Sequence, residues 1–273
     1  KVYMTGCTFL NNEGYYGGAF RAVCGRDHYI ANNIFTHNTG VSGGSVVLGG
    51  QPDSTMFVNN FIANNTATTS GGGGFRTSGY STPILMNNIV VNNHSQENGG
   101  GIKVGYYSNP LLINNIIVNN TCDLYGGGLF TSCSIDSVIV YNTIIGGNVA
   151  ADTGDQVYLK EVNELQTVKF FNCDIQGDSS SFVYETGNSS YIMYENCIDE
   201  NPLFVNPSVE AGTAITTIPE DWRIAATSPC VDSGSNVVYA LDNFPETDFF
   251  GFKRNIAGMT DIGVHEYEKV REI

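Results

Sequence analysis

Short apolar runs recur along the first two-thirds of the chain, and a polar corner follows each of them at a nearly constant spacing. One series of asparagines lies immediately before apolar strands: Asn33, Asn60, Asn88, Asn115, Asn142, Asn172 and Asn196. A second series closes the same strands: Asn12, Asn38, Asn65, Asn93, Asn120 and Asn148. Both series share a spacing of about 27 residues. Two independent series with one period indicate an internal structural repeat.

A third marker in each repeat is a group of glycines before another apolar strand, as in Gly72–Gly74 before Phe75. Each repeat therefore contains three short strands. This length, with no helical periodicity and with Asn or Gly at fixed corners, is typical of a parallel β-helix, in which each repeat forms one turn. Leucine-rich repeats need a Leu/Asn consensus, and a propeller blade needs about 40 residues or more. We predict an all-β parallel β-helix, a solenoid with about 27 residues and three strands per turn, over residues 1–199.

The repeat decays from about Cys197, and residues 200–273 are acidic, contain prolines and show no period. The last turn of a solenoid exposes unpaired strand edges and an open core. We therefore predict that residues 200–273 form an irregular C-terminal cap, packed on the same solenoid.

Alternation along the strands assigns side chains to the two faces of each sheet. After the glycines, an apolar column is expected to face inward: Phe20, Val46, Phe75, Ile102 and Leu129. The residues that follow are expected to face outward: Arg21, Val47, Arg76, Lys103 and Phe130.

A second column predicted to face outward is entirely apolar: Ile30, Phe57, Leu85, Leu112 and Ile139. Its neighbours on either side, such as Tyr29 and Ala31, are then expected to face inward. Exposed apolar stripes of this kind mark interfaces. We expect the C-terminal segment or a partner chain to cover this one.

Composition limits the possible partners. The chain has 273 residues, is 14% charged, and carries a net charge of −15, which argues against nucleic-acid binding. Residues 1–150 hold five basic and six acidic residues, so the remainder carries −14. No apolar run is long enough for a transmembrane helix. The seven cysteines are scattered and without a C-x-x-C pair; we expect most to be buried thiols, and the sequence leaves their disulfide status open.

Candidate chemistry concentrates on the basic outward column. Arg76 and Lys103 are 27 residues apart, hence on adjacent turns, and Arg21 lies in the same column. With Tyr106 and Tyr107 in the flanking loops, we predict a site for an extended acidic glycan, since cations attract the polymer and rings can stack on sugars. The plain alternative is that these are solubilising residues and turn aromatics. If the protein is an enzyme, Arg76 and Lys103 are the catalytic candidates, because a lyase needs a base and a cation beside the uronate.

Other reaction centres are not indicated. Acids in the repeats are sparse and out of register, whereas glycoside hydrolysis needs two carboxylates about 5–9.5 Å apart. The four histidines are scattered, so no zinc site or catalytic triad is predicted. We expect no cofactor and no metal site. Pairs such as Asp152 and Asp155 leave only a weakly held calcium open.

Several motifs resemble those of known families. Phe9-Leu10-Asn11-Asn12 with Gly17-Gly18-Ala19 resembles the repeats of chlamydial polymorphic outer-membrane proteins. The C-terminal part is similar to the ending of right-handed parallel β-helix proteins of the choice-of-anchor type, common in Bacteroidetes. The similar stretches are Asn201-Pro202-Leu203-Phe204, Asp221-Trp222-Arg223-Ile224, Ser228-Pro229-Cys230-Val231-Asp232-Ser233-Gly234, Gly251-Phe252-Lys253-Arg254 and Asp261-Ile262-Gly263-Val264-His265-Glu266. Cys230 and His265 depart from the usual Ala and Tyr.

This resemblance implies a right-handed solenoid and an extracellular or outer-surface location in a bacterium. We therefore expect a secreted or cell-surface protein that binds glycans or partner surface proteins, as an adhesin-like or structural module. The alternative is a polysaccharide lyase or another glycan-degrading enzyme that acts on an acidic polysaccharide.

Overall fold

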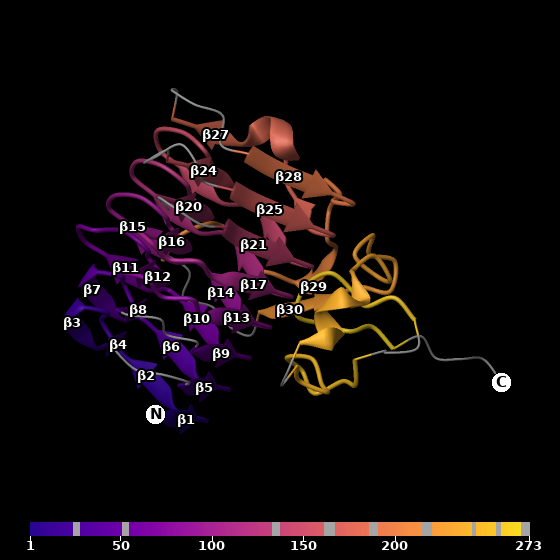
Figure 1. Cartoon of the computed structure of the whole chain (residues 1–273), viewed down its shortest axis with the longest axis horizontal. Coiled ribbons are helices and arrows are strands. Elements are labelled where there is room, and N and C mark those ends of the chain that lie inside the picture. The colour runs from indigo at the N-terminus through magenta and orange to yellow at the C-terminus, as the bar shows by residue number, and fades with distance from the viewer. Residues whose placement is uncertain are drawn as a thin grey trace.

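The computed structural model describes residues 1–23, 28–50, 55–132, 137–160, 167–185, 191–213, 220–241, 244–254 and 258–268. The chain winds into a parallel β-solenoid, whose turns stack side by side (Figure 1). The predicted fold class is confirmed. Each complete turn crosses four sheets in succession, named here sheets 1 to 4.

Sheet 1 consists of β1 (Tyr3–Thr5), β5 (Tyr29–Ala31), β9 (Met56–Val58), β13 (Ile84–Met86), β17 (Leu111–Ile113), β21 (Ser137–Tyr141), β25 (Thr167–Phe171) and β28 (Tyr191–Glu195). Sheet 2 consists of β2 (Thr8–Leu10), β6 (Ile34–Thr36), β10 (Phe61–Ala63), β14 (Ile89–Val91), β18 (Ile116–Val118), β22 (Ile144–Gly146) and β26 (Asp174–Ile175).

Sheet 3 consists of β3 (Glu13–Tyr16), β7 (Thr39–Ser42), β11 (Thr66–Ala67), β15 (His94–Ser95), β19 (Thr121–Cys122) and β23 (Val149–Ala150). Sheet 4 consists of β4 (Phe20–Val23), β8 (Val46–Gly49), β12 (Phe75–Ser78), β16 (Ile102–Val104), β20 (Leu129–Thr131), β24 (Val157–Leu159) and β27 (Val183–Tyr184). Sheet 3 supplies the strand of each turn that the sequence pattern missed, because four of its six strands have only two residues, which are too few to show an alternation.

The remaining elements lie near the end of the solenoid and beyond it. They are the 3₁₀ helix η1 (Ser179–Ser181), the antiparallel pair β29 (Phe204–Asn206) and β30 (Asp221–Ile224), and the 3₁₀ helix η2 (Asn236–Ala240).

The interior holds one continuous apolar core, to which every turn contributes in register. The inward column predicted for sheet 4 is confirmed: Phe75 pairs with Val46 on one side and Ile102 on the other, and all three are buried. Aromatic rings also stack along the axis, with the Phe9 and Phe35 centroids 4.8 Å apart. Burial of each such side chain stabilises the fold by about 1.5–3 kcal/mol.

The predicted outward stripe on sheet 1 is wrong for four of its five members. Ile30, Phe57, Leu85 and Leu112 are fully buried in the main core. The physical reason is a bend: Asn32 has a left-handed backbone (φ 57°) between the strand and the inward-facing Asn33, so it reverses the phase of the alternation. The residues expected to face inward, such as Tyr29 and Ala31, therefore face outward.

Ile139, the fifth member, belongs to another column. It pairs with Leu111, not with Leu112, and is half-buried on the outward side, whereas Val138 and Val140 face the core. Ile139 therefore faces outward, as predicted, but it is one residue out of register with the other four residues of the predicted stripe.

Asparagines occupy two neighbouring positions in these turns, one at the left-handed corner and one that points inward. Asn33, Asn60, Asn88 and Asn115 point inward and form a chain in which each backbone N–H and side-chain amide donates to the next Oδ1. The second predicted series forms a ladder of the same kind, from Asn12 to Asn148.

Asn142, Asn172 and Asn196 do not continue the first ladder. They occupy the left-handed corner one residue earlier, with φ of 49–54°. Thr143, Cys173 and Cys197 take the inward positions instead.

The C-terminal segment packs along the side of the solenoid, against the outward faces of sheets 1 and 2 (Figure 1). Trp222, Ile262 and Val264 cover the apolar outward residues of β14, β18 and β22, and Val238 covers those of sheet 1. The described contacts of this segment are therefore with the side of the solenoid, whereas the sequence predicted a cap over its last turn. Covering of outward apolar residues was expected, but the covered columns are the neighbours of the predicted stripe.

The corner asparagines hold this segment in place. The Asn114 amide donates to the carbonyl oxygens of Asp261 (3.1 Å) and Gly263 (3.0 Å), and that of Asn92 donates to Glu210 and Gly212. Side-chain amides thus bind the backbone of a second segment, which satisfies polar groups that would otherwise be buried unpaired.

A buried ion pair joins two of the C-terminal motifs to each other and to the solenoid. Arg254 Nη1 lies 3.2 Å from Glu266 Oε2, and its Nη2 donates to Asn87 Oδ1 at 2.7 Å. Asp261 Oδ1 and Oδ2 accept backbone N–H groups from Asp232 and Tyr267. These motif residues therefore build the docking of the segment.

Candidate functional site

The basic outward column lies on sheet 4, and the strand register sets its order. Arg21 pairs with Val47, Val47 with Arg76, and Arg76 with Lys103. Each lies immediately after an inward-facing core residue, so rigid strands hold these side chains on the outer face. The structure therefore brings together the three cations that the sequence singled out, in one column, with Arg76 and Lys103 on adjacent strands.

Arg76 is half-buried and incompletely bonded. Its Nη1 donates to Ser42 Oγ, while its Nε is buried without a hydrogen-bond partner among the described residues. Burial lowers the pKa of this guanidinium, although an arginine remains charged at any physiological pH. Arg76 thus presents a charge that its own surroundings only partly satisfy.

Lys103 lies beside Arg76 in a similar setting. Its Nζ donates to the Ser70 carbonyl oxygen (2.7 Å) and lies 5.3 Å from the Phe130 ring centroid. Its pKa is lowered to about 8, chiefly by burial and then by the neighbouring Arg76, whereas Glu97 acts in the opposite direction. In the described part of the chain, neither Arg76 nor Lys103 forms an ion pair within 4.0 Å.

A shallow hollow separates Arg21 from Arg76. It has a volume of about 140 Å³, and Val47 and Gly49 contribute to its lining. The Arg21 guanidinium lies over the Tyr16 ring, 4.3 Å from its centroid. Small residues between two guanidinium groups leave room for an anionic group that contacts both.

The tyrosines lie at the ends of the strands that carry Arg76 and Lys103. Tyr106 is exposed, and Tyr107 stacks on Tyr80 with centroids 4.5 Å apart and planes within 5°. Tyr80 and Tyr107 both have left-handed backbones (φ 61° and 58°), a strained state for an aromatic residue. No cation–π contact joins these rings to Arg76 or Lys103 within the described ranges. They border the column rather than touch it.

Beyond Lys103 the same outward column of sheet 4 continues with aromatic residues, since Phe130 pairs with Lys103 and Tyr158 pairs with Phe130. Tyr125 stacks on Tyr158 (4.7 Å), and Tyr158 stacks on Phe130 (5.5 Å). Because Phe130 and Tyr158 are buried, they support the Lys103 side chain but offer little ring surface to a ligand.

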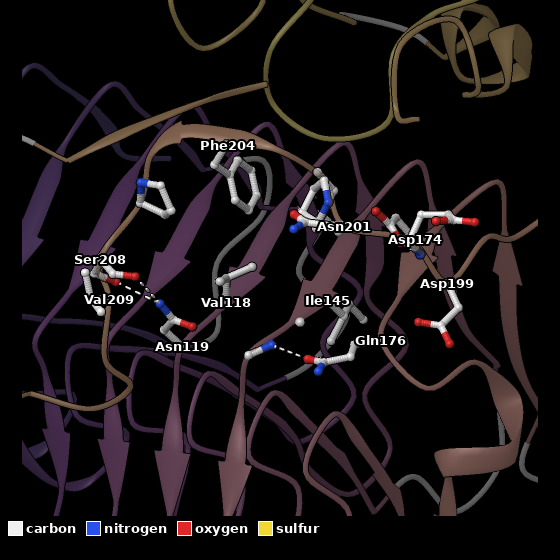
Figure 2. A pocket seen from close by; sticks show the side chains of 16 residues that line it. Val118, Asn119, Ile145, Asp174, Gln176, Asp199, Asn201, Phe204, Ser208 and Val209 are labelled. Atoms are coloured by element: carbon white, nitrogen blue, oxygen red, sulfur yellow. Dashed lines mark hydrogen bonds between the residues drawn. The ribbon is translucent and has the colours of Figure 1, made fainter. Parts of the chain in front are cut away.

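A second, larger cavity was not foreseen from the sequence. Figure 2 shows it between the outward face of sheet 2 and the segment 199–209 that crosses this face. Its volume is about 460 Å³, and Val118, Ile144 and Phe204 form part of its apolar lining. It joins residues from β18, β22 and β26 with a segment outside the repeats, so no local motif could indicate it.

The polar groups of this cavity mostly serve the fold. Asp174 is buried and accepts hydrogen bonds from Glu200 N (3.1 Å) and Cys230 Sγ (3.2 Å), and its burial raises its pKa to about 6. Asn119 donates to Ser208 O and Oγ, both at 2.9 Å. These bonds fasten the crossing segment to the solenoid.

The described residues contain no cluster of three His, Cys, Asp or Glu side chains suited to a metal ion. Within the same residues, no helix has the length and apolar character that crossing a bilayer requires.

Comparison with known proteins supports the architecture. A family model described as a right-handed β-helix region matches residues 30–198. The crystal structure of pectate lyase Pel9A is similar at 11% sequence identity and a TM-score of 0.30, over 97% of this chain and 87% of the lyase chain. No curated protein matches the chain.

Proposed function

The chain belongs to the right-handed β-helix family, and from this premise we propose that it binds an acidic polysaccharide along the outward face of sheet 4. The observation that carries the proposal is the pair Arg76 and Lys103. These cations are adjacent, in register and half-buried, and without a carboxylate partner among the described residues, in a chain of net charge −15.

Physical chemistry supports an anionic ligand. Burying part of a charge without a partner costs free energy, and a carboxylate that arrives with the ligand recovers it through charge-assisted hydrogen bonds. The rungs of a solenoid are about 4.8 Å apart. A column of cations along the axis therefore suits a polymer with repeated anionic groups better than a single small anion.

The location follows from the ligand class. Acidic polysaccharides are components of cell surfaces and extracellular matrices, so we propose a secreted or cell-surface protein of a bacterium. Between glycans and partner proteins, the pair of cations and the exposed Tyr80 and Tyr106 favour the glycan.

The test is binding to polygalacturonate, alginate and hyaluronan, with neutral dextran as the reference polymer, by affinity electrophoresis at low salt. Arg76→Ala combined with Lys103→Ala is expected to weaken binding by about tenfold or more, because each charge-assisted contact contributes about 1.5–3 kcal/mol. Lys169→Ala combined with Lys253→Ala changes the net charge equally elsewhere and is the matched control. Undiminished binding by the Arg76/Lys103 variant would contradict the proposal.

One observation favours catalysis as a second candidate. Lys103, with its pKa lowered to about 8, could take the proton from the carbon next to a uronate carboxylate, while Arg76 neutralises that carboxylate. The electron pair of the C–H bond would form a double bond as the glycosidic C–O bond breaks, and the leaving oxygen would take up a proton. Ultraviolet absorbance of the unsaturated product tests this step.

The two candidates differ in their pH dependence. Binding needs charged Lys103 and weakens as the pH rises through about 8, whereas elimination needs neutral Lys103 and accelerates over the same range. If wild-type protein binds a uronate polymer and yields no unsaturated product at pH 9, the protein is a binding module only.

A further inference from the structure

Two cysteines occupy consecutive positions in the inward ladder of the last turns. Phe171 pairs with Glu195 in the strand register, and Ile198 N donates to Cys173 O, so Cys173 and Cys197 lie side by side. Earlier turns carry asparagine or threonine at this position. Cys7 occupies it in the first turn, where its neighbour is Asn33.

The two cysteines are in contact. The Cys173 backbone N–H donates to Cys197 Sγ at 3.4 Å, and each thiol donates to a carbonyl oxygen at its own corner, Cys173 to Phe171 and Cys197 to Glu195. Adjacent strands of a sheet are about 4.8 Å apart, which falls within the usual Cα separation of a disulfide, about 4.4–6.8 Å. Little backbone movement is needed to join the two sulfurs.

The pair is also asymmetric in a way that favours thiol–disulfide exchange. Cys197 is partly accessible, and the hydrogen bond from Cys173 lowers its pKa. Cys173 is fully buried, and burial raises its pKa. The accessible sulfur is therefore the better attacking thiolate, while the buried one is positioned to resolve a mixed disulfide.

We propose that Cys173 and Cys197 form a disulfide that cross-links the last two turns of the solenoid. The oxidant is a low-molecular-weight disulfide. The Cys197 thiolate attacks it and releases one small thiol, which takes up a proton. Cys173 then loses its proton and attacks Cys197 Sγ, and the second small thiol leaves. Two protein thiols are thus oxidised, and one small disulfide is reduced to two thiols.

The cross-link would join two segments that contribute to the wall of the larger cavity. Cys173 directly precedes Asp174, and Cys197 lies two residues before Asp199; both acids line that cavity (Figure 2). A disulfide here fixes the start of the crossing segment to β26. Because it also closes a loop in the unfolded chain, oxidation is expected to raise the Tm by about 5–10 °C.

Mass spectrometry of the full-length protein decides the proposal. After incubation with glutathione disulfide and alkylation of free thiols, the tryptic peptide 170–223 contains only these two cysteines. It is expected to lack both alkyl groups and to weigh two hydrogen atoms less than the reduced peptide. Chymotrypsin, which cleaves at the aromatic residues between them, should then yield two fragments joined by the disulfide.

Variants provide the controls. Cys197→Ser should abolish the cross-linked peptide, whereas Cys7→Ser, at the same ladder position in the first turn, should leave it unchanged. Recovery of peptide 170–223 with both cysteines alkylated, or with glutathione retained on Cys197, would overturn the proposal. The wild-type protein alone gives this answer, whether or not a variant folds.

Discussion

The outward faces of sheets 2 and 4 differ in the residues that they carry and in whether the C-terminal segment covers them. On sheet 2 the outward residues of the middle turns are apolar, such as Ile116 and Ile144, and the C-terminal segment buries them. On sheet 4 the corresponding column carries Arg76 and Lys103, which remain half-exposed. The apolar outward column thus marks where the chain covers itself, and the basic one lies on the face that we propose binds the ligand.

The turns next to sheets 2 and 4 differ in the same way. Beside sheet 2 the turns are asparagines, and Asn114 and Asn119 bind the covering segment with their amides. Before sheet 4 the turns are glycines: Gly99 has φ +71°, and an added Cβ would lie 2.9 Å from the Ile102 carbonyl oxygen. Glycine provides the tight turn but no side-chain amide, so these corner glycines lack the group with which Asn114 and Asn119 hold the covering segment.

The largest expected effect comes from breaking the cover. Arg254→Met removes the cation from beside the buried Glu266 carboxylate, which keeps its hydrogen bonds from Thr260 and Asp261, so we expect a loss of about 3–5 kcal/mol in the free energy of unfolding. Urea unfolding measures the loss, and limited proteolysis should cut residues 200–268 first. Lys253→Ala, at the exposed neighbour, should change little. Equal stability of the two variants would mean that the ion pair does not hold the segment.

Loss of one inward asparagine should rank next. Asn88→Ala removes the acceptor for the Asn60 backbone N–H and the donor to the Phe57 carbonyl, at about 1–3 kcal/mol for each group left unpaired. Asn12→Ala, at the exposed end of the other ladder, should cost less than about 1 kcal/mol. Thermal unfolding compares the two variants, and equal Tm values would show that the inward asparagine ladder does not stabilise the fold.

The smallest effect is a pH dependence confined to the covered face. Burial raises the pKa of Asp174 to about 6, so its folded form retains a proton that the unfolded chain releases near pH 4. Its contribution is fully present below about pH 4 and is lost as the pH rises through about 6, a fall of about 3 kcal/mol. Asp174→Asn should reduce the fall of stability measured from pH 4 to 7, while Asp261, whose pKa burial raises to about 7, retains its own share. An unchanged profile would show that Asp174 is not responsible.

Much of this architecture was predictable, because repeated asparagines and glycines report the period directly. The inward column of sheet 4 and the Arg76–Lys103 pairing followed from that period and simple alternation. The faces of sheet 1 could not be predicted in this way, because a left-handed residue such as Asn32 reverses the alternation of inward and outward side chains. The sequence also does not distinguish an asparagine at a left-handed corner from one in the inward ladder.

The larger cavity and the lateral cover lay beyond sequence reasoning for a related reason. Both depend on where residues 200–268 pack, and bonds such as that from Asn119 to Ser208 join positions 89 apart without a repeated pattern. The C-terminal motifs did point to this segment, and the structure gives them a physical role in docking.

The most direct test of the contrast between the two faces is hydrogen–deuterium exchange of the wild-type protein, with and without whichever of the three uronate polymers binds most tightly. If the ligand binds along sheet 4, exchange slows in peptides covering residues 75–80 and 102–107 and stays unchanged in residues 203–266. Protection confined to residues 203–266, with none on sheet 4, would contradict the proposal.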